Sequence, residues 1–117
     1  MDSPHWKREP EDHDFPAALE YLSLITSPVN AARYVEDLRR GQTYNRKAKD
    51  LLRASHLELL PRDNRHVKKD LKKIEDGEKL SPVLVIRGHP MIIADGYHRI
   101  CASYHLDEDV EVPCRIA

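Results

Sequence analysis

Short apolar runs alternate with amphipathic stretches in the second half of the chain. Residues 83–86 (Val-Leu-Val-Ile) and 91–94 (Met-Ile-Ile-Ala) are uninterrupted apolar runs, a pattern typical of buried strands. Apolar positions at 56–60 and 110–116 predict two more strands. Pro113 lies inside the last of them and has no amide hydrogen, so this strand should run along an edge of the sheet or carry a bulge.

Two helices are expected between these strands, giving the order β-α-β-β-α-β from residue 55 onward. In the first helix Asp63 or Asn64 is placed to cap the N-terminus, and Gly77 ends it. The second helix should run from about residue 97 to 105. The apolar positions of the first helix, spaced i, i+4 and i+7, are Val67, Leu71 and Ile74.

The first half of the chain predicts helices that pack on this core. Helices are expected from Pro16 to about residue 25, from Ser27, a typical N-cap followed by proline, to Gly41, and over 45–54. Residues 1–15 are polar and acidic and predict a flexible arm, disordered or loosely docked. The expected apolar positions are Val29, Ala32, Val35 (or Tyr34) and Leu38 in the second helix, and Ala48, Leu51 and Leu52 in the third.

Composition narrows the class of protein. The chain of 117 residues, with 33% charged and 40% hydrophobic residues, is sufficient for one α+β domain with one modest core. No apolar run approaches the roughly 20 residues that span a bilayer, and the N-terminus lacks a secretory signal. Two cysteines make no disulfide framework. We therefore expect a cytoplasmic protein without membrane contact.

Candidate functional side chains are concentrated at residues 95–99, Asp-Gly-Tyr-His-Arg, where an apolar strand is followed by a glycine and then by a helix. The first amides of a helix have no partner within it and lie at the positive end of its dipole. Together with His98 and Arg99, they predict an anion site, most naturally for phosphate.

This segment and its surroundings resemble the ParB/sulfiredoxin superfamily. The likeness rests on three stretches in order, which are 80–85 (Leu-Ser-Pro-Val-Leu-Val), 93–102 around the glycine, and the closing run 110–114. It covers about half of the chain and implies a ParB/sulfiredoxin-like β-α-β-β-α-β core, here residues 55–117, preceded by the helical segment 16–54. It also implies a nucleotide ligand, either CTP or ATP/ADP, whose phosphates lie against this segment.

The resemblance is read residue by residue. Relative to ParB domains, Gly96, Arg99 and Ala102 match, whereas Tyr97, His98 and Cys101 stand where those domains carry glutamate and two arginines, which argues against CTP hydrolysis. Relative to sulfiredoxins, Tyr97 replaces the catalytic cysteine, so sulfiredoxin activity is not expected. The Asp-Gly-x-His-Arg form also resembles free serine kinases, which bind an adenine nucleotide.

Several side chains have two interpretations. Asp95 is either the N-cap of the helix or a Mg²⁺ ligand. Tyr97 shares a helical stripe with Ile100 and Tyr104, so it is either a core residue or a ligand contact. Cys101 and His105 lie four apart and could form a nucleophile–base pair, although no third orienting residue is evident. No zinc-binding spacing is present, so no zinc is expected.

Basic residues supply further candidates. Arg62 or Arg65 would close on the nucleotide from the loop opposite the glycine. The lysines after them form either a solvated face or a surface facing phosphate, and a second basic region lies between residues 33 and 53. The lysines are Lys68, Lys69, Lys72 and Lys73.

Three functions follow as hypotheses. The first is a nucleotide-binding module that holds phosphates at Gly96, Tyr97, His98 and Arg99. The second is an ATP- or ADP-dependent small-molecule kinase, with His98 in an acid–base role and Asp63 or Glu58 as base. The third is a DNA-backbone-binding protein, although no helix-turn-helix segment follows the core. Whether catalysis occurs, and whether the chain forms homo-oligomers, stays open.

Overall fold

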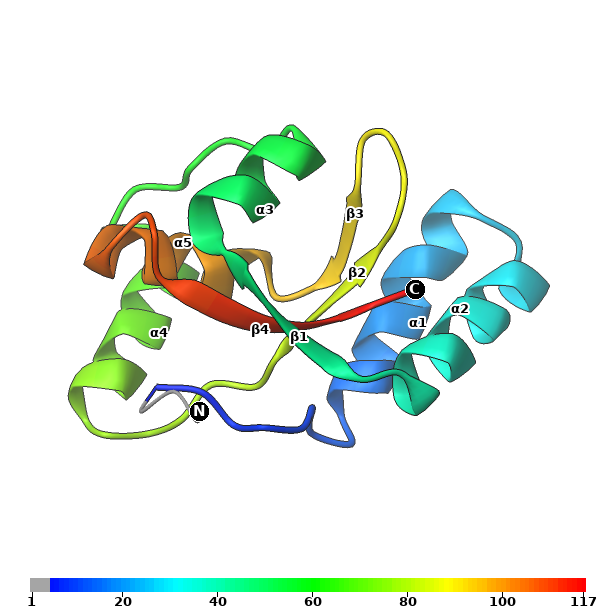
Figure 1. The fold of residues 1–117 in the computed structure, drawn as a ribbon, viewed down its shortest axis with the longest axis horizontal. Coiled ribbons are helices and arrows are strands. Elements are labelled where there is room, and N and C mark those ends of the chain that lie inside the picture. Colours follow the sequence, from blue (N-terminus) through cyan, green and yellow to red (C-terminus); the bar gives the residue numbers. More distant parts are fainter. Residues whose placement is uncertain (1–4) are drawn as a thin grey trace.

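The computed structural model describes residues 5–117, which form an α+β fold in three layers. A mixed four-stranded sheet of order β1-β4-β2-β3 has α1 and α2 on one side and α3, α4 and α5 on the other (Figure 1). No helix within residues 5–117 combines the length and apolar character needed to cross a bilayer. The elements are α1 (Asp14–Ile25), α2 (Pro28–Arg40), β1 (Thr43–Lys47), α3 (Ala48–Ser55), α4 (Arg65–Glu75), β2 (Val83–Ile86), β3 (Ile92–Asp95), α5 (Tyr97–Leu106) and β4 (Glu111–Ile116).

Strand β2 is buried on both faces, which explains its unbroken apolar sequence. Because side chains alternate along a strand, Val83 and Val85 join one apolar cluster, whereas Leu84 and Ile86 join the other. The first cluster contains residues of α3, α4, α5 and β4, and the second is built with α1 and α2. Both helical layers therefore depend on this one strand.

Strand β2 and the helices α4 and α5 confirm the sequence prediction, and β3 lies one residue later than the expected 91–94. The first predicted strand, 56–60, is wrong. Residues 56–60 are in no strand; instead, side chains of α5 bond to the carbonyls of Glu58 and Leu60. The strand lies earlier, because Thr43–Lys47 pairs antiparallel with β4, and the helix expected over 45–54 begins only at Ala48. The pattern could not show β1, since four of its five residues are exposed.

The expectation for Pro113 is wrong in one respect, because β4 lies inside the sheet, between β1 and β2. Pro113 faces Asn45 on β1, and the parallel pairing with β2 starts only at the next residue, Cys114. The proline thus lies just before the doubly paired part of the strand, where a missing amide disturbs the ladder least.

The buried side of α2 also differs from the expected stripe. Ala31, Val35 and Leu38 are buried, at i, i+4 and i+7, while Val29 is 71% exposed and Ala32 is also exposed. Val35 and Leu38 are thus buried as expected, whereas Ala31 takes the place expected for Ala32. The position of α1 and the sheet decides which of these neighbouring residues is covered.

The N-terminal segment is packed against the body of the protein from residue 5 onward, unlike the flexible arm expected for 1–15. Trp6 is 2% exposed and belongs to the cluster of α3, α4 and α5. Its neighbours hold Leu80 on both sides, since Lys7 N–H donates to Leu80 O and Leu80 N–H donates to His5 O, each at 2.8 Å. Residues 1–4 of the expected arm lie outside the described residues.

Trp6→Ala should lower the free energy of unfolding by about 3–5 kcal/mol, because it empties a buried site of indole size. Chemical denaturation measures the change. Leu24→Ala, at a residue that is 81% exposed, is the control and should stay within about 0.5 kcal/mol of the wild type. Equal stabilities for the two variants would show that the segment is undocked.

Candidate functional site

The turn from β3 into α5 is built on a close approach between Gly96 and β2. Gly96 has φ +113°, a conformation that glycine adopts freely and L-residues rarely do. A Cβ at this position would meet the side chain of Val83, with 2.8 Å to its Cβ. Helix α5 starts immediately afterwards, and its first internal hydrogen bond runs from Ile100 N–H to Gly96 O. The amides of residues 97–99 therefore have no acceptor within the helix.

Arg99 ties this turn together. One Nη donates to Asp95 Oδ2 at 3.0 Å and to Pro82 O at 3.2 Å, so the guanidinium joins β3 to the segment that leads into β2. Its Nε is buried and has no hydrogen-bond partner among the described residues. Asp95 is therefore not the helix cap; Gly96 occupies that position, with no side-chain cap. The Asp95 carboxylate is instead the partner of Arg99.

Helix α4 lies against α5 and supplies the opposite wall of a cleft of about 180 Å³. From α4 come four polar residues spaced i, i+3, i+4 and i+7, which is one continuous helical stripe. The cleft is lined by His66, Lys69, Asp70 and Lys73 of α4 and by Asp95, Gly96, His98 and Arg99. The sequence pattern indicated the lysines of α4 as one possible phosphate-facing surface. It gave no sign that Asp70 belongs to the site.

The lysines of α4 divide between the cleft and solvent. Lys69 and Lys73 line the cleft and form no ion pair with the described residues. Lys68 and Lys72 do not line it, and Lys72 pairs with Asp76 at 3.1 Å. The cleft thus receives two cations that form no ion pair with any carboxylate of residues 5–117.

Burial sets the protonation of the remaining groups. It raises the pKa of Asp95 and of Asp70, and Arg99 opposes both shifts. The pKa of His98 is lowered by burial first and by the nearby His66 second. The site therefore disfavours charge on its own carboxylates and imidazole, which are partly withdrawn from water.

The other residues predicted for the site lie elsewhere. Arg62 donates to His105 O at the far end of α5, and Arg65 lines a separate surface groove rather than the cleft. Tyr97 turns its hydroxyl away to Glu58 O and packs on the core. Glu58 and Asp63 are exposed and do not line the cleft, and Asn64, not Asp63, caps α4. None of these five residues lines the cleft between α4 and α5.

Cys101 and His105 do not form an activated pair. Cys101 is fully buried, and burial raises the pKa of its thiol. The Nε2 of His105 lies 2.7 Å from Leu60 O and makes its bond there. Among residues 5–117, no three or more His, Cys, Asp and Glu side chains are grouped to hold a metal ion.

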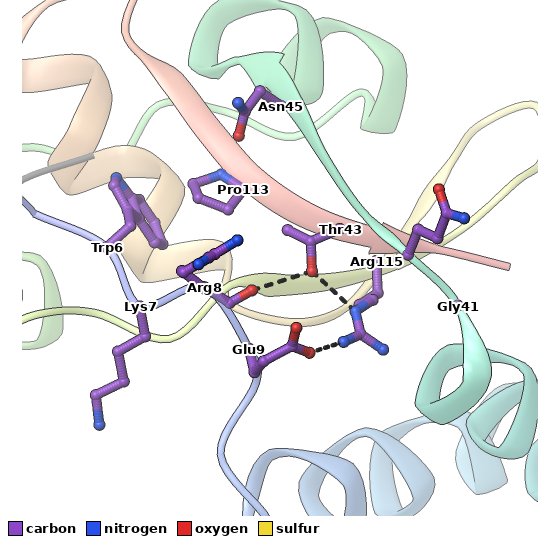
Figure 2. A pocket seen from close by; sticks show the side chains of 10 residues that line it. Trp6, Lys7, Arg8, Glu9, Gly41, Thr43, Asn45, Pro113 and Arg115 are labelled. Atoms are coloured by element: carbon purple, nitrogen blue, oxygen red, sulfur yellow. Dashed lines mark hydrogen bonds and ion pairs between the residues drawn. The ribbon is translucent and has the colours of Figure 1, made fainter. Parts of the chain in front are cut away.

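A second cleft of about 370 Å³ lies between the N-terminal segment and the β1–β4 side of the sheet (Figure 2). Arg115 dominates it, is 6% exposed, and donates to Thr43 Oγ1, to the carbonyls of Leu38 and Arg39 and to Glu9. A cation there neutralises the C-terminal end of α2. Lys7, which also lines this cleft, forms an ion pair with Glu11. We therefore interpret this cleft as structural.

No protein-family model matches this chain, and neither does any curated protein or solved structure.

Two glycines at positive φ allow a matched test of the Gly96 turn. Gly77→Ala, at φ +82° with no atom near the added Cβ, should cost about 1–2 kcal/mol from backbone conformation alone. Gly96→Ala carries that cost and also collides with Val83, which adds about 1–3 kcal/mol. Denaturant titration of both variants gives the difference. A Gly96 variant no less stable than the Gly77 variant would contradict the close approach.

Asp70→Asn should raise the melting temperature at pH 7 by on the order of 3 °C. Since the folded-state pKa of Asp70 is raised, its charged form costs stability above that pKa, and the cost disappears as the carboxyl is protonated. The gain should therefore vanish near about pH 3, where the carboxyl is protonated in both states. Asp63→Asn, at an exposed carboxylate, is the control. A gain that persists unchanged in acid would contradict this cause.

Proposed function

We propose that this protein is a nucleotide-binding module that holds the phosphates of its ligand in the α4–α5 cleft. One observation carries the proposal: Lys69 and Lys73 of α4 line a cleft with the glycine turn and Arg99, and neither lysine has an ion-pair partner in the described part of the chain. Lysine and arginine side chains beside the open amides of a helix N-terminus are well suited to phosphate oxygens.

The size of the cleft favours the phosphate end of a larger ligand. Its volume of about 180 Å³ is below the roughly 300–1,000 Å³ typical of sites that enclose a whole small molecule. The remainder of the ligand would therefore extend outside. The resemblance of residues 93–102 to the phosphate segment of the ParB/sulfiredoxin superfamily supports a nucleotide, and CTP, ATP and ADP stay as candidates.

Binding is better supported than the kinase alternative. A phosphotransferase needs a base near the acceptor, and the two carboxylates expected for that role, Glu58 and Asp63, do not line the cleft. The Mg²⁺ role considered for Asp95 is not part of the proposal, because its carboxylate pairs with Arg99. Any Mg²⁺ would arrive with the nucleotide.

DNA binding is also less supported, because the basic region between residues 33 and 53 is largely engaged within the protein. Lys47 and Lys49 approach Asp109, at 3.8 and 2.7 Å. Four arginines of the region are engaged as well: Arg40 pairs with Glu36, Arg53 with Asp50, Arg39 lies over the ring of Phe15, and Arg46 lies over that of Tyr44.

A thermal-shift panel tests the proposal. CTP, ATP, ADP, GTP and inorganic phosphate, each with and without Mg²⁺, should include at least one ligand that raises the melting temperature. At a concentration one hundred times its Kd, that ligand adds about 2.7 kcal/mol to the free energy of unfolding. If no member of the panel stabilises the protein, the proposal is wrong.

Helix α4 provides a matched pair of variants. Lys69→Gln with Lys73→Gln removes the two cations of the cleft and should weaken ligand binding by about 10-fold or more, the effect of losing roughly 1.4 kcal/mol. Lys68→Gln with Lys72→Gln removes the same charge from outside the cleft and should leave Kd nearly unchanged. Equal losses in the two pairs, measured by calorimetry, would place the ligand elsewhere or make the effect one of net charge.

A further inference from the structure

Two histidines from different helices meet over the cleft. The ring centroids of His66 on α4 and His98 on α5 are 4.6 Å apart, with 45° between the ring planes. Both residues line the cleft, and neither imidazole makes a hydrogen bond or ion pair with the described residues. Their ring nitrogens are therefore available to a ligand, and His98 is partly withdrawn from water.

The charged groups that face this pair come from four elements. Helix α4 contributes Lys69, Asp70 and Lys73, and α5 contributes Arg99, with the ring of Tyr97 beside His98 at 5.6 Å. Strand β3 contributes Asp95, which interacts electrostatically with Asp14 and His13 at the start of α1. With both histidines neutral, three cations and two carboxylates line the cleft; with both protonated, its net charge rises by two.

We propose that anion binding in the α4–α5 cleft is coupled to protonation of the His66–His98 pair, so that the bound phosphate is held by two imidazolium donors in addition to the lysines. This inference rests on the proposed function and specifies how the same site is regulated. It makes the protein a binder whose affinity increases as the pH falls.

The direction follows from the environment of the pair. In the free protein, burial, His66 and Arg99 lower the pKa of His98, while Asp70 opposes them, so the environment favours the neutral imidazole. A dianion bound beside the two rings stabilises the positively charged form of each imidazole. By linkage, a protonation favoured by the ligand strengthens binding as the pH falls.

Sulfate is the decisive probe because it remains a dianion over this pH range, whereas the second pKa of a phosphate ester is about 6. Any pH dependence of sulfate binding therefore comes from the protein. Measured by calorimetry from about pH 8 to pH 5.5, sulfate affinity should increase by up to tenfold per pH unit for each proton taken up. At pH 7, titrations in two buffers of different ionisation enthalpy should show net proton uptake.

Variants separate the histidines from the two carboxylates, which also titrate in acid. His66→Gln with His98→Gln should still bind sulfate through Lys69, Lys73 and Arg99, but with a flat pH profile. His89→Gln, at an exposed histidine in the β2–β3 turn, should keep the wild-type profile. NMR titration of the wild-type imidazoles needs no variant, and the pKa of His98 should rise when sulfate is added.

The outcomes distinguish the two claims. Sulfate and phosphate binding without pH dependence, or a pH profile that survives in the double variant, overturns the histidine coupling and leaves phosphate binding intact. The absence of anion binding at every pH overturns the proposed function and the coupling with it.

Discussion

The contact between Gly96 and Val83 is the constraint on which the rest of the site depends. Because glycine carries no Cβ and adopts a positive φ, the chain leaves β3 and enters α5 directly against β2. Arg99 then reaches both Asp95 and the carbonyl of Pro82, which links the helix, its preceding strand and the neighbouring strand. The orientation of α5, and hence the position of His98 against α4, follows from this one close approach.

The α4–α5 cleft and the cleft around Arg115 use charge in opposite ways. The guanidinium of Arg115 donates to backbone carbonyls, a hydroxyl and Glu9. These bonds hold α2 and the N-terminal segment to the sheet. In the α4–α5 cleft, Asp70 is partly buried, and neither it nor Lys69 nor Lys73 forms an ion pair within residues 5–117. Charges held at such a cost are more typical of a functional site than of a stabilising one.

The N-terminal segment packs against both the helices and the sheet. Trp6 fills the cluster of α3, α4 and α5, while Glu9 reaches Arg115 at the end of the sheet. A polar, acidic stretch of sequence is thereby held against the sheet by one large side chain and one ion pair. Its composition alone resembles that of a disordered arm, because a single tryptophan hardly changes the mean polarity of fifteen residues.

Local pattern alone determined much of this protein: the strand at 83–86, a second strand at 91–94 that the structure has at 92–95, the helix with Val67, Leu71 and Ile74, and the glycine turn followed by His98 and Arg99. These features rest on apolar periodicity and turn chemistry, which act between neighbours in the chain. Only the tertiary structure decided that 43–47 is a strand and 56–60 is not, that β4 lies inside the sheet, and that Arg62 and Arg65 are replaced at the cleft by Lys69 and Lys73. Each of these depends on contacts between segments far apart in sequence, and exposed polar residues leave no periodic pattern from which such a partner can be identified.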